Sequence, residues 1–247
     1  MFKRMKLVIA AACILFPMTI IGQTNPSDQI ITNENFSYQP TSTDMQGTWR
    51  TSGSGDTRII LSGVLNTNIE IGGLSAKDIL KISGFSGSGF TIQRDAGTFS
   101  FEGYLSVSGK GSGRFYFRPD KGFADKMKYL QFAGLKENND TSLYYYSVHN
   151  LSCDYAMKIK EAGYNGTSSA DLLLLRSSGV TPEYIQVLIK IGYKNISSDD
   201  LILLSVQKVP TDFIKSVIGT SDNLPTIREL TLIWMYGDKA AKYKQKK

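Results

Sequence analysis

Histidine and cysteine are nearly absent from this chain of 247 residues, which contains one His and two Cys. One of the cysteines, Cys13, lies in a hydrophobic N-terminal segment, so removal of that segment would leave only Cys153. A single imidazole cannot build a His-rich metal site, and a single thiol cannot form an intramolecular disulfide. The composition therefore argues against a metal centre or a disulfide framework, and we expect no metal ion and no cofactor.

The chain also has no excess of one charge in its interior. Its net charge of +6 comes from the two ends, because residues 23–237 hold 20 basic and 21 acidic residues. Without a basic stripe, no nucleic-acid surface is expected. Hydrophobic residues make up 41% and charged residues 20%, which excludes a disordered chain and a multi-pass membrane protein.

Residues 1–22 have the three parts of a secretory signal peptide. Three basic residues precede a 15-residue apolar run, Leu7–Ile21, and the small residue Gly22 suits cleavage before Gln23. The run is shorter than the roughly 20 residues of a membrane span. We therefore predict an exported protein, periplasmic or extracellular. A retained membrane anchor and a lipoprotein modified at Cys13 are the alternatives.

Two polar segments flank the part of the chain with folding patterns. Residues 23–46 are rich in Asn, Ser, Thr and Gln, which predicts a linker or a loosely tethered arm. Residues 238–247 contain five lysines and one acidic residue. Such a tail is usually a solvated end, and weak contact with an anionic membrane is the more specific interpretation.

From residue 122 the chain divides without gaps into four blocks of 29 residues. The blocks are 122–150, 151–179, 180–208 and 209–237. Position 4 of each block is acidic, position 9 is aliphatic, position 13 is Gly in the first three blocks, and position 22 is always Leu. These columns are Asp125, Asp154, Glu183 and Asp212; Leu130, Ile159, Leu188 and Val217; Gly134, Gly163 and Gly192; Leu143, Leu172, Leu201 and Leu230. A fixed period of this length predicts a helical repeat array.

Each block reads as a helix, a turn and a second helix. Thr181 before Pro182 is typical of a helix start, and the acid at position 4 then faces the positive end of the helix dipole. Gly192 suits a left-handed helix end, and Ser197 with Asp200 has the pattern of a capping box. Neither short helix can bury its apolar face alone, so the blocks must stack.

Residues 47–121 carry the alternation of β-strands and turns. Aromatic residues share one parity within three of the expected strands, and a short helix is expected over 75–84. The expected strands are 57–61, 67–71, 89–94, 98–105 and 113–118. The fold class is therefore α+β: a small antiparallel β-domain, either a curled sheet or a sandwich, followed by four helix-turn-helix blocks.

Several motifs in this part and in the repeats resemble a known arrangement. They are Arg94–Phe99, Phe101–Gly103 and Gly111–Pro119, followed by Asp171-Leu172, Gly179–Ile185 and Gly192-Tyr193. Over residues 57–237 the chain resembles uncharacterised exported bacterial proteins in which a small β-module precedes helical repeats. The module is also similar to a region appended to some β-lactam-sensor-type membrane metallopeptidases, whose His-Glu-x-x-His helix this chain lacks. The resemblance implies an extracytoplasmic sensing or interaction accessory, and it supplies no catalytic residue that can be transferred to this chain.

The array suggests where binding would occur if the protein is a binding or scaffold protein of the cell envelope. Inter-block core columns hold the array together, so recognition falls to exposed positions 7, 8 and 11. The candidate binding residues on the array are Phe132, Lys158, Glu161, Lys190 and Lys215, and those on the β-domain, opposite in parity to Phe115, are Arg114, Tyr116 and Arg118. The expected partner is a protein or an envelope polymer.

Two other functions remain open at this point. An envelope hydrolase could use two of the carboxylates Asp95, Glu102 and Asp120. A soluble sensor accessory of a membrane partner is the function that the resemblance implies. His149 is expected at a helix end and Cys153 as a small packed residue, and the repeat spacing supplies neither with an oriented catalytic partner.

Overall fold

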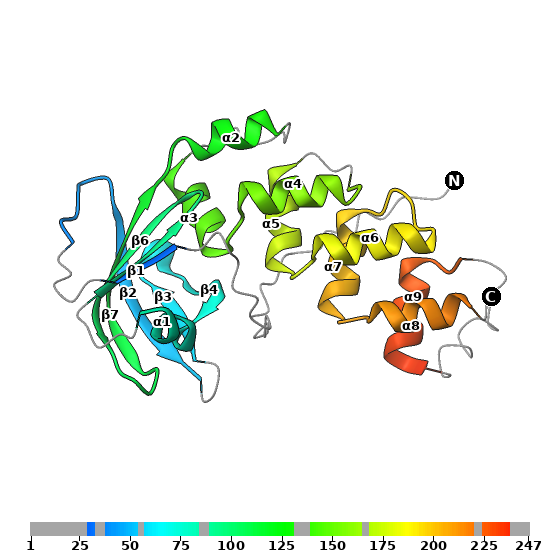
Figure 1. The fold of residues 1–247 in the computed structure, drawn as a ribbon, viewed down its shortest axis with the longest axis horizontal. Coiled ribbons are helices and arrows are strands. Elements are labelled where there is room, and N and C mark those ends of the chain that lie inside the picture. The colour runs from blue at the N-terminus through cyan, green and yellow to red at the C-terminus, as the bar shows by residue number, and fades with distance from the viewer. Residues whose placement is uncertain are drawn as a thin grey trace, which may run out of the picture.

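The computed structural model describes a curled antiparallel sheet followed by an array of paired helices (Figure 1). The described residues are 29–32, 38–53, 57–83, 89–130, 139–164, 168–219 and 224–237. The α+β class expected from the sequence is confirmed. The leader 1–22 and the tail 238–247 lie outside the described residues. Within the described ranges, no helix is both long and apolar enough to span a membrane.

The sheet has seven strands in the order β1-β5-β6-β7-β2-β3-β4. The strands are β1 (Gln29–Thr32), β2 (Met45–Ser52), β3 (Arg58–Ser62), β4 (Asn68–Ser75), β5 (Gly89–Arg94), β6 (Gly97–Leu105) and β7 (Gly111–Pro119), with a 3-10 turn η1 (Val64–Asn66) and the short helix α1 (Ala76–Ser83) between them. The expected strands 89–94, 98–105 and 113–118 match β5, β6 and β7 to within two residues at each end.

The arm expected over residues 23–46 contributes to the sheet. β1 pairs with β5 at one sheet edge, with Ile30 opposite Ile92. Three strands, β5, β6 and β7, separate β1 from β2 in the sheet. Tyr38, which precedes β2, stacks on the Tyr116 ring with the ring centroids 5.1 Å apart. The prediction of a loose tether is therefore wrong at these residues, because backbone pairing and ring stacking hold them.

Aromatic side chains fill the concave side of the sheet. Phe99 lies opposite both Ile92 and Phe117 in register, and Phe101 lies opposite Phe115. All of these rings are fully buried, as the shared parity predicted. Burying a ring of this size from water is among the largest single contributions to stability that a small domain has.

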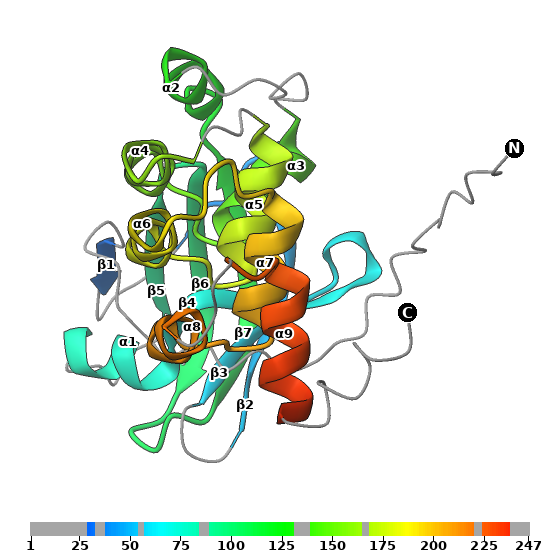
Figure 2. The same cartoon turned by 90° about the vertical axis from the view of Figure 1, so that its right-hand side faces the viewer.

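Eight helices follow in the described part of the chain, two in each block of 29 residues. The helices are α2 (Phe123–Tyr129) and α3 (Asp140–Val148), α4 (Cys153–Glu161) and α5 (Ser169–Ser177), α6 (Pro182–Ile191) and α7 (Ser198–Val206), α8 (Thr211–Ile218) and α9 (Ile227–Tyr236). Figure 2 shows them as two rows, α2-α4-α6-α8 and α3-α5-α7-α9. Contacts run from α2 to α4, α4 to α6, α6 to α8, α5 to α7 and α7 to α9, which confirms the stacking, whereas α3 packs mainly on the sheet strands β4, β6 and β7.

The repeated columns have the roles that the sequence predicted. Leu143, Leu172, Leu201 and Leu230 are all fully buried. The hydroxyl oxygens of Thr181 and Ser197 accept hydrogen bonds from backbone N–H groups three residues later, and Thr226 with Glu229 forms a complete capping box.

A column that the sequence analysis missed ends every block. Position 29 has a positive φ in all four blocks: Asn150 (φ 53°), Gly179 (φ 76°), Lys208 (φ 52°) and Gly237 (φ 55°). In the first three blocks this residue follows the second helix and leads the chain into the next block. Asn and Gly tolerate this conformation, whereas at Lys208 it is an uncommon conformation.

Tyrosine hydroxyls tie consecutive blocks together. Tyr155 Oη donates to the Val180 carbonyl at 2.9 Å, and Tyr184 Oη donates to the Val209 carbonyl at 2.8 Å. The same column in the fourth block is Phe213, which has no hydroxyl and packs on Trp234 with ring centroids 4.9 Å apart. In the fourth block this aromatic residue therefore packs within its own block, and the role of a capping block stays a prediction.

The β-domain and the array meet at a buried joint. Arg94, 5% exposed, donates from Nη1 to the carbonyls of Ser147 and Val148 at 2.5 and 3.0 Å, and from Nη2 to that of Gly72 at 2.6 Å. Tyr144 of α3 packs on the Phe99, Phe115 and Phe117 rings, so the block-one tyrosines do meet the β-domain. Because a guanidinium cannot lose its charge, these carbonyl contacts fix α3 against the sheet.

Candidate functional site

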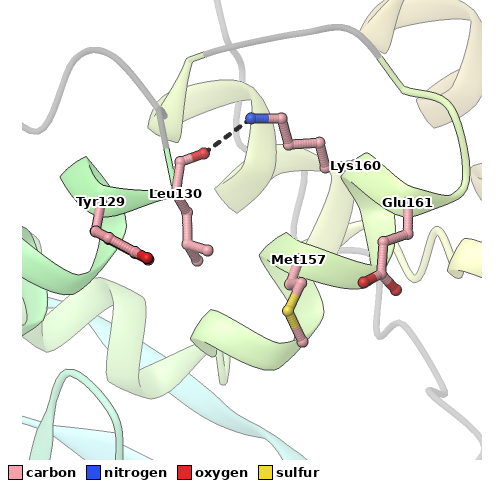
Figure 3. A pocket seen from close by; sticks show the side chains of 5 residues that line it. All are labelled: Tyr129, Leu130, Met157, Lys160 and Glu161. Carbon is pink, nitrogen blue, oxygen red and sulfur yellow. Dashed lines mark hydrogen bonds between the residues drawn. The ribbon is translucent and has the colours of Figure 1, made fainter.

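A candidate site among the described residues is a shallow hollow where the end of α2 meets α4. Its volume is about 480 Å³, and it is lined by Tyr129, Leu130, Met157, Lys160 and Glu161 (Figure 3). The first two residues come from block one and the other three from block two. Stacking of the two blocks therefore creates the hollow, and neither block has it alone.

Large apolar side chains in this hollow face solvent. Tyr129 is 87% exposed and Met157 is 42% exposed. Leu130, at the bottom, is partly buried against the core. A thioether and a phenol ring placed this way offer an adaptable apolar surface with a hydroxyl at its edge.

Lys160 closes the hollow on the side of the α2 terminus. Its Nζ donates to the Leu130 carbonyl oxygen at 3.1 Å (Figure 3). Leu130 is the C-cap of α2, where the carbonyl end of the helix dipole favours a cation. The contact holds block two on block one, and it leaves the Glu161 carboxylate exposed on the other rim.

The hollow brings together three of the columns expected to carry recognition. Tyr129 is at position 8 of its block, and Met157 and Glu161 are at positions 7 and 11 of theirs. Lys160, at position 10, was not predicted, although a lysine in the last turn of a helix is itself a signal of a helix-end contact. Phe132 lies outside the described residues.

The three lysines predicted on the array are exposed but lie outside the hollow. Lys158 pairs with Asp154 at 2.8 Å, and this hydrogen bond raises the pKa of the lysine. Lys215 pairs with Asp212 at 3.1 Å. Lys190 is in the last turn of α6. Surface pairs within one helix contribute little energy, so the pairs of Lys158 and Lys215 stabilise their own helices only slightly.

The candidate residues on β7 have different surroundings from one another. Arg114 is exposed, as expected from its parity. Tyr116 is only 7% exposed, because Tyr38 covers its ring. The prediction of an exposed Tyr116 is therefore wrong. Arg118 forms an ion pair with Asp44, with Nε 3.2 Å from Oδ1, and its guanidinium lies over the Tyr38 ring.

Burial and hydrogen bonding shift the pKa values of Tyr38 and Asp44, which lie beside Arg118. Burial would raise the pKa of Asp44, but hydrogen bonds from Arg118 and from the Thr41 backbone outweigh it and lower that pKa. Burial, together with the hydrogen bond to Asp44, raises the pKa of Tyr38 to about 12. Tyr38, Asp44 and Arg118 thus form a polar cluster that attaches the segment before β2 to the outer face of the sheet.

The carboxylates considered for a hydrolase each have a structural partner. Asp95 accepts the backbone N–H of Cys153 at 2.8 Å, at the start of α4. Asp120 accepts the backbone N–H of Gly122 at 2.8 Å and pairs with Lys126. Glu102 accepts the Tyr116 hydroxyl at 3.3 Å. These contacts connect elements of the fold.

His149 and Cys153 both lie near the joint. Burial, aided by the positive charge of Arg94, lowers the pKa of His149 to about 4. Burial, aided by the Asp95 carboxylate, raises the pKa of the Cys153 thiol to about 12. At neutral pH the imidazole is therefore neutral and the thiol protonated, and neither is prepared for nucleophilic chemistry. Among the residues that the structure describes, no three metal-ligating side chains come together.

A second, smaller hollow of about 310 Å³ lies at the next block junction. Its walls come from the turn of block two and from α6 and the start of α7, and they include Tyr164, Ile189, Ile196 and Ser198. Ile189 and Lys160 occupy the same position in their blocks. The two hollows are thus features of successive block junctions.

Comparison with known proteins adds no family. The chain matches no family model, and neither a curated protein nor a solved structure is significantly similar to it. The resemblance to exported bacterial β-modules stays a prediction, and the functional argument rests on the geometry described above.

Proposed function

We propose that this chain is an exported binding or scaffold protein of the cell envelope, without catalytic activity of its own, and that a partner docks in the hollow between α2 and α4. The observation that carries the proposal is the gathering of Tyr129 and Met157, both solvent-exposed, in one hollow formed by two blocks. The leader supports export.

The chemistry of the hollow suits macromolecular recognition. Tyr and Met are enriched at the centres of protein interfaces, where a large side chain excludes water without a charge to desolvate. Glu161 and the Tyr129 hydroxyl lie at its rim and offer polar contacts. The partner class that fits best is a protein with an apolar anchor side chain, and a polymer of the envelope is the second class.

The structural partners of the carboxylates support a role other than catalysis. Asp95, which caps α4 from the sheet, is needed for the joint, and Asp120 is held by Lys126. A general acid needs a carboxyl group that is free to exchange its proton with substrate. Whether the protein acts alone or as the sensor accessory of a membrane partner depends on what the hollow binds.

A site-specific crosslinking experiment tests the proposal. A photo-reactive benzoylphenylalanine replaces Tyr129 in the full chain, is irradiated in cells that export the protein, and the adduct is identified by mass spectrometry. The matched control carries the same group at Tyr236, which is 52% exposed at the far end of the array. A discrete adduct from position 129 and not from position 236 is expected.

The partner from that adduct is then titrated against purified variants. Tyr129→Ala and Met157→Ala should each weaken binding by more than about 1 kcal/mol, or roughly fivefold, as interface anchors do. Thermal stability should stay nearly unchanged, because both side chains are exposed. Equal adducts from both positions, or unchanged affinity in both variants, would overturn the proposal.

A further inference from the structure

The outer face of the central strands carries two arginines, Arg50 and Arg114, that form no ion pair with the described residues. Inward residues of β2, β6 and β7 alternate with outward ones, and the outward ones form two rows across the sheet. By strand register, one row consists of Arg50, Ser112 and Tyr104, and the neighbouring row consists of Thr48, Arg114 and Glu102. The rows lie opposite Trp49 and Phe101, whose side chains are in the core. This surface is separate from the hollow between α2 and α4.

Arg50 and Arg114 differ from the other arginines on the sheet. Both are exposed, and neither forms an ion pair within the part of the chain that the structure describes. By contrast, Arg58 pairs with Glu70 at 3.1 Å and Arg118 pairs with Asp44 at 3.2 Å. As diagonal neighbours on adjacent strands, Arg50 and Arg114 have Cβ atoms roughly 7–8 Å apart. An anion that contacts both guanidinium groups would offset the repulsion between their like charges, so binding of an anion is favoured here.

The neighbours of these arginines indicate the rest of the ligand. Tyr104, 67% exposed, presents its ring in the same row as Arg50, with Ser112 between them. Thr48 and Ser112 are exposed and add short hydroxyl groups. Guanidinium groups bind carboxylates and phosphates bidentately, and an exposed ring with nearby hydroxyls offers stacking and hydrogen bonds to a sugar.

We propose that this outer face binds an anionic polysaccharide, whose acid groups pair with Arg50 and Arg114 and whose sugar rings lie on Tyr104. Glu102 lies directly across from Arg114 and competes for it with the ligand's acid group. The carboxylate therefore limits affinity, and its removal should strengthen binding.

Calorimetric titration of the full chain with oligogalacturonate, a carboxylated oligosaccharide of defined length, tests the proposal. Arg50→Gln combined with Arg114→Gln should weaken binding by about tenfold or more, and Glu102→Gln should strengthen it by about threefold. Tyr104→Ala should weaken binding without altering its dependence on salt, because the ring carries no charge. Thermal melts confirm that the variants are folded.

The matched control is Arg58→Gln, which removes one positive charge from an arginine already paired on the same sheet. Loss of affinity in this control equal to that in Arg50→Gln or Arg114→Gln alone, each of which also removes one positive charge, would overturn the proposal in favour of general charge attraction. Absence of binding to oligogalacturonate would also overturn it, as would binding of polyglutamate alone, which would assign the face to an acidic peptide. None of these results bears on Tyr129 and Met157, so this inference can fail while the proposed function stands.

Discussion

The β-domain and the helical array are held together by side chains of different kinds. In the sheet, each buried ring has its own set of neighbours, as Phe99 has Ile92, Phe117 and Tyr144. In the array, the same leucine column is buried once in every block. Truncating a side chain in a core of unique contacts should change the free energy of unfolding by a different amount at each position. In a repeated core, the same truncation should have the same effect at equivalent positions.

The largest effect is expected in the aromatic core. Phe99→Ala should lower the free energy of unfolding by about 3–5 kcal/mol, the range for truncating a buried aromatic ring. The ring contacts Tyr144, so the loss should extend across the joint into α3. Urea unfolding followed by tryptophan fluorescence, with the buried Trp49 and the more exposed Trp234 as reporters, measures it. A loss under about 1 kcal/mol would show that the rings do not form a cooperative core.

The leucine column should show equal effects along the array. Leu172→Ala and Leu201→Ala should each cost about 2–4 kcal/mol, and the two values should agree to within about 1 kcal/mol. Leu174→Ala is the matched control, because Leu174 is 51% exposed and its loss should cost no more than about 0.5 kcal/mol. Clearly unequal values at Leu172 and Leu201 would show that the blocks are not energetically equivalent.

Burial of His149 near the joint should make the free energy of unfolding depend on pH. His149 has a pKa near 4 in the fold, lowered from an ordinary value of 6.5, so the unfolded chain binds its proton more tightly. The contribution of His149 to the free energy of unfolding is therefore fully present above about pH 6.5. It falls by as much as about 3 kcal/mol as the pH drops toward 4. His149→Gln should flatten that slope in urea midpoints measured from pH 7 to 4. An unchanged slope would place the pH dependence elsewhere.

The smallest effect concerns the ties between blocks. Tyr184→Phe removes the hydroxyl that donates to Val209 and should cost about 1 kcal/mol. Tyr155→Phe should cost a similar amount, because its hydroxyl makes the equivalent bond to Val180. Differential scanning calorimetry of both variants provides the measurement. If neither melting temperature moves, the hydroxyl bonds contribute nothing beyond the ring packing.

Much of the array could be predicted because its information is repeated. Four copies of one pattern revealed the acidic helix starts, the buried leucines and the turn glycines without any three-dimensional knowledge. Position 29 escaped because Asn150, Gly179 and Lys208 share a backbone conformation and no side-chain property.

The sheet was predictable only where its strands alternate clearly. β2 has the sequence MQGTWRTS, in which Trp49 alone is buried, so no apolar pattern indicated a strand. Burial of Tyr116 depends on Tyr38, which is far away in the sequence. The acceptors of Arg94 are backbone carbonyls, which leave no trace in the residue types.

The candidate site was predicted in part. The exposed columns at positions 7, 8 and 11 did contribute Tyr129, Met157 and Glu161 to the hollow. That these three meet, and that Lys160 closes one side, depends on how block two stacks on block one. Helix stacking geometry decides this, and the repeat alone does not specify it.

The contacts of the fourth block have a consequence for the order in which the array unfolds. Blocks that contact only their neighbours unfold progressively from a terminal block. Among the described residues, the first block is clamped to the sheet by Arg94, while the last block packs on the third block alone. Amide exchange should thus be fastest in α8 and α9 and slowest beside the sheet. A pull on the C-terminal end would peel the array block by block, and the hollow between α2 and α4 would be the last of the block junctions to open.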